Sequence, residues 1–440
     1  MSSRLSSLSG RRAVLFVLAL CAAAVLAVDA PRAQRPSTLA ITGASIVPRP
    51  GADATIGTIV ITNGTIAAIG LGAAVPPGAE VINADGLVAY AGFLDAATSV
   101  GAETDGRERV SGSPTDIDQD LTRAALAATR SVNRKGIFPD YAVGQNLRIA
   151  NGAADTWRAA GFTAIHSMPT RALLAGTSAV ALLLDSADAP GTRAIVDADT
   201  MLVAGWRAPS DDYPRSLMGS IAHLRQTFLD AQHYQTVWDI YRETDGASRR
   251  PGYDFALEAL RPVLDGALPV VFPAGRQDEI DRALGFASEF DLRLVVDGGQ
   301  EATKAASRLA DAGVPVLLRI DFPTRPRRHT PNLERLEARA RTIGRPLTPD
   351  MMRSARRADR DTRLREPAGR FDDRLRAWQT RVDTAAGLTA SGHPFAITTR
   401  GQRDAEQFLA NLRLAMEAGL SHDAALEALT LGPAGILGVE

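Results

Sequence analysis

Short apolar runs separated by segments of helical length constrain the fold of this chain more than any other feature. After Gly92, six such runs read as strands: GFTAIHSM, SAVALLLDS, ALPVVFPA, LRLVVDGG, VPVLLRID and PFAITT. The segments between them, such as 221–241, 278–290 and 301–312, carry apolar residues at helical spacing. Strands that alternate with helices build βα units around a mostly parallel sheet, and six or more of them over roughly 350 residues predict a (β/α)8-type barrel of the α/β class.

Residues 34–90 follow a different pattern. β-rich runs alternate there with turn residues, and Asn63-Gly64 stands between two apolar runs. Asn-Gly in that setting is a strong hairpin signal. We therefore expect a small antiparallel β unit over 34–90, followed by the domain of βα units over 91–440.

The first 33 residues have the layout of a secretory signal peptide. Arginines precede the apolar run 13–28, and small residues follow around Ala30 and Ala33. We expect residues 1–33 to be removed, which leaves a periplasmic or secreted protein without a stable membrane span. An uncleaved membrane anchor is the alternative, since the run is just short of a spanning helix.

Composition excludes several classes of function. The 49 Lys and Arg residues face 50 Asp and Glu residues, and a net charge of −1 argues against a general nucleic-acid binder. The single cysteine, Cys21, excludes a disulfide framework, a CxxC redox pair and a cysteine-based zinc site. Only Lys135 and Lys304 can supply a lysine amine.

Residues 325–381 are strongly basic, with 17 arginines against 8 acidic residues. We interpret this stretch as an exposed helical insertion between two barrel strands, which closes with the amphipathic run 371–388. A basic patch for an anionic ligand or partner is the alternative, although the stretch has few of the aromatic residues on which nucleic-acid bases stack.

Four segments of the chain resemble the amidohydrolase superfamily, and most closely its imidazolonepropionase-like metal-dependent hydrolases. They are AGFLDAATSVG (91–101), AAGFTAIHSM (159–168), PVVFPAGRQDEIDRAL (269–284) and NLRLAMEAGLSHDAALEALTLGPAGILGVE (411–440). The resemblance implies a β/α barrel with a small β sandwich, of which 34–90 forms half. It also implies one or two divalent metals, such as zinc, that activate water against an amide or similar C–N bond.

The metal ligands of that family are replaced in this sequence. The family places histidines on the first, a middle and a later barrel strand, and an aspartate on the last strand. The corresponding positions hold Ala97, Ser99, Pro273, Asp297 and Arg400. We therefore expect no metal cofactor in this chain, although relatives use one.

The six histidines form no local metal motif, because no two of them stand two, three or four residues apart. His166 differs from the others in ending an apolar strand, which would place it at the barrel mouth. The candidate catalytic residues are His166, Asp297, Asp321 and Arg400. The candidate substrate-binding residues are Arg171, Arg319 and Thr399, with the arginines suited to a carboxylate or phosphate.

Three functions fit a chain with these candidate site residues and with the metal ligands of the family replaced. The first is a degenerate amidohydrolase-like barrel that acts by binding, and the second is an active hydrolase of C–N bonds with a rearranged site. The third is a periplasmic barrel that binds an anionic solute.

Family members add sandwich strands beyond the Pro-Ala-x-x-Leu-Gly phrase near Glu440. We therefore also expect a partner chain or second domain to complete the sandwich and protect its edge, unless the sequence is a truncated copy of a longer protein.

Overall fold

The structure is a computed structural model, and it describes residues 38–102, 136–150, 152–184, 194–207, 214–244, 249–327, 332–361 and 368–439. The expected signal peptide and Lys135 lie outside these ranges. The chain divides into two compact units between Ala91 and Gly92. Among the described residues, no helix is both long enough and apolar enough to cross a membrane.

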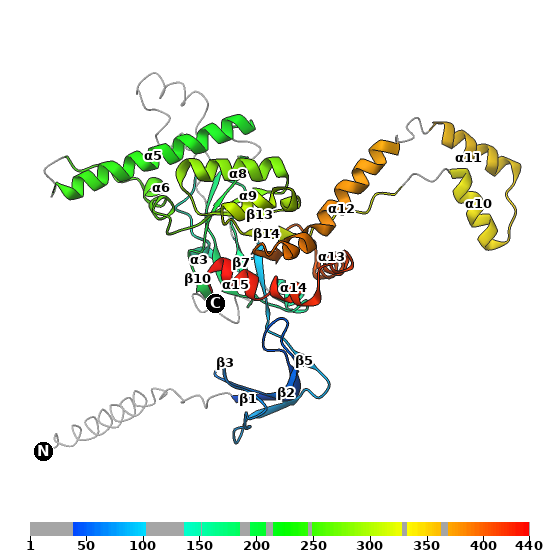
Figure 1. The fold of residues 1–440 in the computed structure, drawn as a ribbon, viewed down its shortest axis with the longest axis horizontal. Helices are drawn as coiled ribbons and strands as arrows, with labels where there is room; N and C mark the ends of the chain where they lie inside the picture. The colour runs from blue at the N-terminus through cyan, green and yellow to red at the C-terminus, as the bar shows by residue number, and fades with distance from the viewer. Residues whose placement is uncertain are drawn as a thin grey trace, which may run out of the picture. The chain divides into compact units, whose positions relative to one another are not determined.

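The smaller unit is a five-stranded sheet (Figure 1). Its strands are β1 (Thr38–Ile46), β2 (Thr55–Thr62), β3 (Thr65–Gly70), β4 (Glu80–Asn83) and β5 (Val88–Ala89). The predicted hairpin joins β2 to β3, and Asn63 and Gly64 both have positive φ, as a type I′ turn requires. The sheet is mixed rather than purely antiparallel, because β4 and β5 pair with β1 in parallel.

One face of this small sheet is apolar and partly exposed. Ile69, Ile59, Ile41 and Ile82 are paired across four neighbouring strands and form one row. Ile69 and Ile82, at the two ends of the row, are 53% and 45% exposed. The partner chain expected for this unit stays a prediction.

The larger unit holds two further sheets, in the orders β10-β9-β7-β6 and β15-β14-β13-β12-β11-β8. The bounds are β6 (Phe93–Thr98), β7 (Phe162–Ser167), β8 (Leu174–Thr177), β9 (Ala179–Leu182), β10 (Ile195–Asp197), β11 (Leu202–Ala204), β12 (Val270–Ala274), β13 (Leu294–Gly298), β14 (Val316–Arg319) and β15 (Phe395–Thr398). β6 is parallel to β7, and β11 to β15 are parallel to one another. The mixed α/β class is confirmed, whereas no ladder joins β6 to β15 among the described strand pairs.

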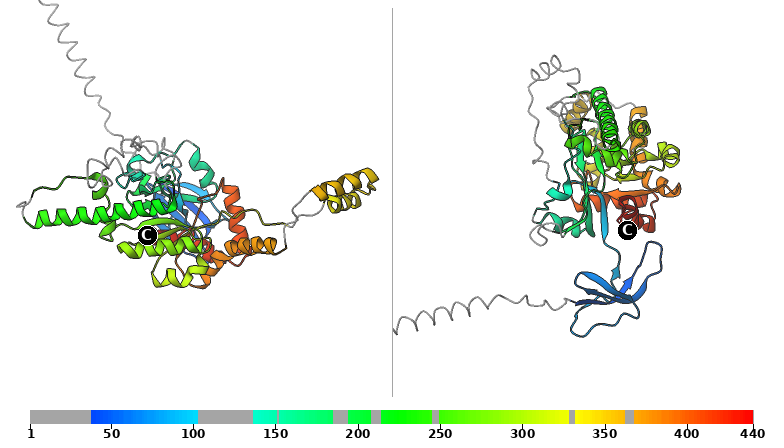
Figure 2. Two further views of the ribbon diagram at one scale, coloured as in Figure 1. Left: turned by 90° about the horizontal axis from the view of Figure 1, so that it is seen from above. Right: turned by 90° about the vertical axis from the view of Figure 1, so that its left-hand side faces the viewer.

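Helices connect and cover these strands. They are α3 (Val143–Asn146), α4 (Ala153–Arg158), α5 (Leu217–Glu243), α6 (Phe255–Glu258), α7 (Arg261–Leu264), α8 (Gln277–Phe290), the 3-10 helix η4 (Ala302–Ala305), α9 (Ala306–Asp311), α10 (Asn332–Ile343), α11 (Pro349–Asp361), α12 (Ala368–Ala390), α13 (Ala405–Glu417), α14 (His422–Glu427) and α15 (Leu431–Leu437). α5 is one long helix (Figure 2), and α8 packs on β12 and β13. The helix predicted over 301–312 begins as η4 and continues as α9.

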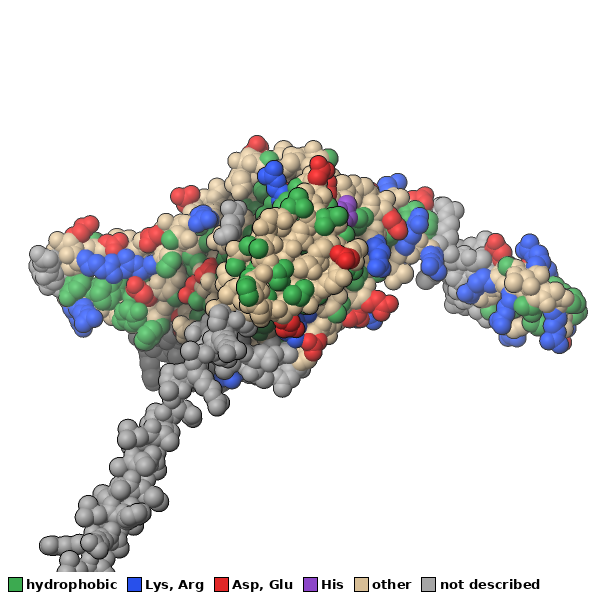
Figure 3. Space-filling view, turned by 90° about the horizontal axis from the view of Figure 1, so that it is seen from below, with side chains coloured by type: hydrophobic (Ala, Val, Ile, Leu, Met, Phe, Trp, Pro, Cys, Tyr) green, Lys and Arg blue, Asp and Glu red, His purple; other side chains and the backbone are tan. Residues whose placement is uncertain are grey.

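The basic stretch is helical, as predicted. Asp359 of α11 accepts hydrogen bonds from the backbone N–H groups of Asn332 and Leu333 at the start of α10, at 2.7 and 3.1 Å. This carboxylate therefore satisfies the first N–H groups of α10 and ties the two helices together. Arginines such as Arg339 and Arg356 are exposed, and Figure 3 shows Lys and Arg side chains over this helix pair.

Aromatic packing connects the core of the larger unit to the end of β12. Trp206 follows β11 and stacks on Phe272 at 4.4 Å, and Phe286 of α8 contacts both rings. The Trp206 indole N–H donates to the Pro273 carbonyl at 2.9 Å. The carboxyl end of β12 is thus held in place by α8 and by the segment after β11.

Candidate functional site

The carboxyl ends of the parallel strands open into a pocket of about 680 Å³. Its walls come from the segments that follow β7, β11, β12, β13, β14 and β15. The side chains that line it include Arg171, Asp297, Gln300, Arg319, Asp321 and Arg400. β/α folds place their binding and catalytic groups at this end of the strands. The structure therefore brings five of the predicted site residues together.

Asp297 holds two of these arginines. Its side chain lies on β13 and is 2% exposed, and it accepts hydrogen bonds from Arg319 Nε at 2.9 Å and from Arg400 Nη1 at 3.0 Å. Burial alone raises the pKa of Asp297, but the charges of the two guanidinium groups outweigh burial and hold the pKa below its usual value. The three side chains form an ion cluster in the lining of the pocket, around a buried carboxylate.

His166 lies outside this pocket, in the core. Its ring is fully buried, with Nδ1 2.7 Å from the Ala96 carbonyl and Nε2 2.6 Å from Ser178 Oγ. Since a carbonyl only accepts, Nδ1 donates to Ala96, and Nε2 accepts from the Ser178 hydroxyl. Burial lowers the pKa of His166 to about 4, so the ring is neutral at pH 7. The two ring nitrogens therefore join β7 to β6 and to Ser178, which precedes β9.

Thr399 is also buried, and its partner is a carboxyl that the sequence did not single out. Asp95 of β6 is 2% exposed and accepts from the backbone N–H groups of Thr399 and Ala97 at 3.0 and 3.2 Å, and from the Thr399 hydroxyl. Burial raises the pKa of Asp95 to about 7, although these hydrogen bonds lower it. The available signal was a single charged residue within the strand FLDAAT.

Asp321 contacts Gln300 rather than an arginine side chain. Gln300 Nε2 donates to Asp321 Oδ1 at 3.1 Å. Because a carboxylate only accepts, this contact fixes the orientation of the amide, and its Oε1 is buried without a hydrogen-bond partner among the described residues. Gly401 passes so close that a Cβ there would lie 2.6 Å from Asp321 Oδ2.

The residues present do not fit a divalent metal of the kind that the resembled family uses. Ala97 and Pro273 offer no donor atom, and Arg400 places a cation where the family has an aspartate. Asp297 retains a carboxylate, but Arg319 and Arg400 already occupy it. Within the described ranges, no group of three or more His, Cys, Asp or Glu side chains is arranged to hold a metal.

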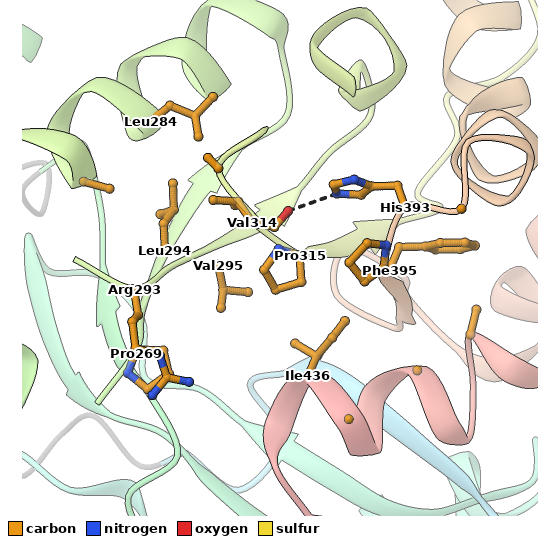
Figure 4. Close-up of a pocket in the computed structure, with 18 of the residues that line it drawn as sticks. Pro269, Leu284, Arg293, Leu294, Val295, Val314, Pro315, His393, Phe395 and Ile436 are labelled. Carbon is orange, nitrogen blue, oxygen red and sulfur yellow. Dashed lines mark hydrogen bonds between the residues drawn. The ribbon is translucent and has the colours of Figure 1, made fainter. Parts of the chain in front are cut away.

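A second pocket, of about 1000 Å³, lies at the amino ends of β12 to β15 (Figure 4). It is mainly lined by apolar side chains such as Val295, Pro315 and Ile436. His393 borders it, and its Nε2 is 2.9 Å from the Val314 carbonyl. This end of β/α folds usually contributes to stability rather than to catalysis. Few charged groups converge here. The smaller pocket is therefore the candidate site.

Comparison with known proteins supports the fold. No protein-family model and no curated protein matches the chain. Among solved structures, an amidohydrolase from Thermotoga maritima MSB8 aligns over 91% of this chain and 89% of its own length, with a TM-score of 0.64 and 19% identity. A Xaa-Pro dipeptidase with bound methionine covers 92% of this chain and 89% of its own, at a TM-score of 0.41 and 14% identity. The chain thus has the fold of the T. maritima amidohydrolase, and the predicted resemblance is confirmed at the level of the fold.

Proposed function

We propose that this chain is a degenerate amidohydrolase-like protein that binds a small molecule in the pocket at the strand ends and lacks metal-dependent hydrolysis. One observation carries the proposal: Arg319 and Arg400 both bond the carboxylate of Asp297. Divalent metals need at least three well-placed ligands. Here the carboxylate left at a family ligand position is already neutralised by protein side chains.

We infer further that the two sheets of the larger unit form one β/α barrel. Ser178 lies between β8 and β9. Its backbone N–H donates to the Met201 carbonyl at 2.8 Å, and its carbonyl accepts from the Thr200 N–H at 2.9 Å, beside β11. On the other side, Asp95 of β6 accepts from the backbone of Thr399, next to β15. Both links support a closed ring of strands, with the pocket at its mouth.

The metal content of the purified chain without residues 1–33 tests this function. Elemental analysis before and after dialysis against zinc and manganese should find no retained metal, because the donor set is missing. Retention of about one or two equivalents through a second, metal-free dialysis would overturn the proposal.

A second candidate is hydrolysis by a rearranged site, and the convergence of Asp297, Asp321 and Arg400 on one pocket favours it. Cyclic amides and dipeptides are suitable substrates for a first assay. Turnover that survives a chelator and is lost in Asp321→Asn would support this candidate over binding alone.

We propose that the protein acts outside the cytoplasm, on the basis of the signal-peptide pattern in residues 1–33. Cell fractionation with N-terminal sequencing should recover an exported chain that begins near residue 34. A full-length chain in the membrane fraction would instead support the uncleaved anchor.

A further inference from the structure

The pocket at the strand ends has an excess of positive charge. Seven arginines and five acidic side chains line it, which leaves a formal charge of +2. Four of the arginines are paired. Arg276 and Arg282 contact Asp278 at 3.0 and 3.8 Å, and Arg319 and Arg400 contact Asp297. Arg171, Arg207 and Arg381 have neither a hydrogen bond nor an ion pair with the described residues.

The remaining acidic side chains of the pocket have other partners. Glu279 accepts from the backbone N–H groups of Gly275 and Arg276, at 2.9 and 3.1 Å. Glu301 accepts from the backbone of Gln277 and from Lys304. Asp321 accepts from Gln300. Each of these carboxylates therefore has a hydrogen-bond partner other than the three arginines.

Arg171 is held in an unusual backbone conformation. Its φ is +61°, in the left-handed region that disfavours any residue with a Cβ. The other non-glycine residues described with positive φ have a local reason: Asn63 forms a hairpin turn and Asp291 ends α8. Arg171 lies in the wall of the pocket instead, and such strain is concentrated at sites that bind ligands.

Arg381 enters the pocket from α12. One turn further along that helix, the Thr384 hydroxyl donates to the Gln300 carbonyl at 2.9 Å, which positions this part of α12 beside the strand ends. Arg381 is half-buried. A guanidinium group that is partly removed from water and has no ion pair with the described residues is complementary to an anion.

We propose that the pocket binds a small organic molecule with two or more negative charges, carried by carboxylate or phosphate groups, through Arg171, Arg207 and Arg381. This inference rests on the proposed function, since it names the ligand class of the same site. The volume of about 680 Å³ suits such a molecule. Guanidinium groups bind carboxylate and phosphate oxygens in the same two-pronged way, so the charge fixes the class and the test separates the two chemistries.

Calorimetric titration of the chain without residues 1–33, at constant ionic strength, tests the ligand class. The probes are propionate with one carboxylate, succinate with two, citrate with three, and glycerol phosphate. Succinate, citrate or glycerol phosphate should bind at least about tenfold more tightly than propionate, which corresponds to about 1.4 kcal/mol. A preference for glycerol phosphate assigns the site to phosphates, and a preference for succinate or citrate assigns it to carboxylates. Equal affinity for propionate, or no binding by any probe, overturns the inference.

Three variants test the residues. Arg171→Gly removes the guanidinium and the backbone strain together, so the affinity for the best probe should fall at least about tenfold while the Tm rises by about 2 °C. Arg381→Gln should also weaken binding at least about tenfold. Arg376→Gln is the control, because Arg376 lies on the same helix, is 70% exposed and does not line the pocket. Wild-type affinity in both Arg171→Gly and Arg381→Gln overturns the assignment.

Metal analysis of the same protein batch separates the two proposals. Retained metal contradicts the proposed function whatever the probes do. If the chain retains no metal but the probes with several negative charges bind no more tightly than propionate, the ligand class alone is contradicted.

Discussion

Two buried carboxylates in the larger unit have pKa values displaced in opposite directions, and their immediate neighbours explain why. Asp95 has hydroxyl and backbone N–H partners, so burial dominates and raises its pKa to about 7. Asp297 has two guanidinium partners, whose charges outweigh burial and lower its pKa. Both side chains are 2% exposed. A nearby positive charge, rather than the degree of burial, decides which carboxyl is ionised.

Asp95→Asn should change the dependence of stability on pH. The pKa of Asp95 is about 7 in the folded chain against an ordinary value of 3.8, so the folded state holds the proton more tightly and wild-type stability falls as pH rises through that window. Asparagine keeps an acceptor for the same N–H groups and carries no charge. Relative to wild type, the variant should gain about 2 kcal/mol between pH 5 and pH 8. Urea denaturation at both pH values measures this, and a pH-independent difference would contradict it.

Asp297→Asn should destabilise the fold, because the substitution removes the carboxylate that both Arg319 and Arg400 contact. We expect a loss of about 3 kcal/mol in the free energy of unfolding. Asp278→Asn is the matched control, since Asp278 also contacts two arginines but is 57% exposed, and it should cost less than about 1 kcal/mol. Similar losses in urea denaturation of the two variants would show that burial of the cluster contributes little.

The sequence could predict which residues converge on the site, but not how they pair. Asp297 and Arg319 end strands and Arg400 follows one, so strand ends alone brought them together. That Arg319 and Arg400 both bond Asp297 depends on the side-by-side order of β13, β14 and β15, which no local pattern contains. Asp95 was missed for the same reason, because its partner Thr399 lies more than 300 residues away in the chain.

At the scale of elements, long apolar runs were predictable and short ones were not. The run LRLVVDGG became β13 and VPVLLRID became β14, because each can fill a buried parallel strand on both faces. β8 reads LAGT and β11 reads LVA, so neither offers an apolar run of strand length. β8 and β11 pair antiparallel, which is an exception within the mostly parallel sheet that the alternation of strands and helices predicted.

Two glycines with the same backbone angle allow the close packing of β13 and β14 to be measured. Gly299 and Gly313 both have a φ of +62°, but a Cβ at Gly299 would lie 2.3 Å from Val316 Cγ1, whereas one at Gly313 meets nothing within 4 Å. Gly313→Ala should cost about 1 kcal/mol from the backbone alone. Gly299→Ala should cost about 1–3 kcal/mol more, because the side chains of β14 must shift. Equal Tm values for the two variants would mean that the strand end relaxes freely.

At the scale of the whole molecule, the two units have separate hydrophobic cores. The small sheet buries Ala44, Ile46 and Ala84 as a cluster of its own, and the larger unit packs its aromatic core elsewhere. Heat should therefore unfold the chain in more than one step. Scanning calorimetry of the full chain should give a calorimetric enthalpy above the van't Hoff enthalpy. A single transition with equal enthalpies would show that the units unfold together.

The cluster of Asp297 with Arg319 and Arg400 also bears on how this protein comes into being. A centre that is completed by a bound ion matures only after the ion is delivered, and it is lost again when the ion is withdrawn. The counter-charges of Asp297 belong to the polypeptide itself. Folding alone assembles this cluster, so its maturation calls for no delivery system and no loading step, even in surroundings poor in metal ions.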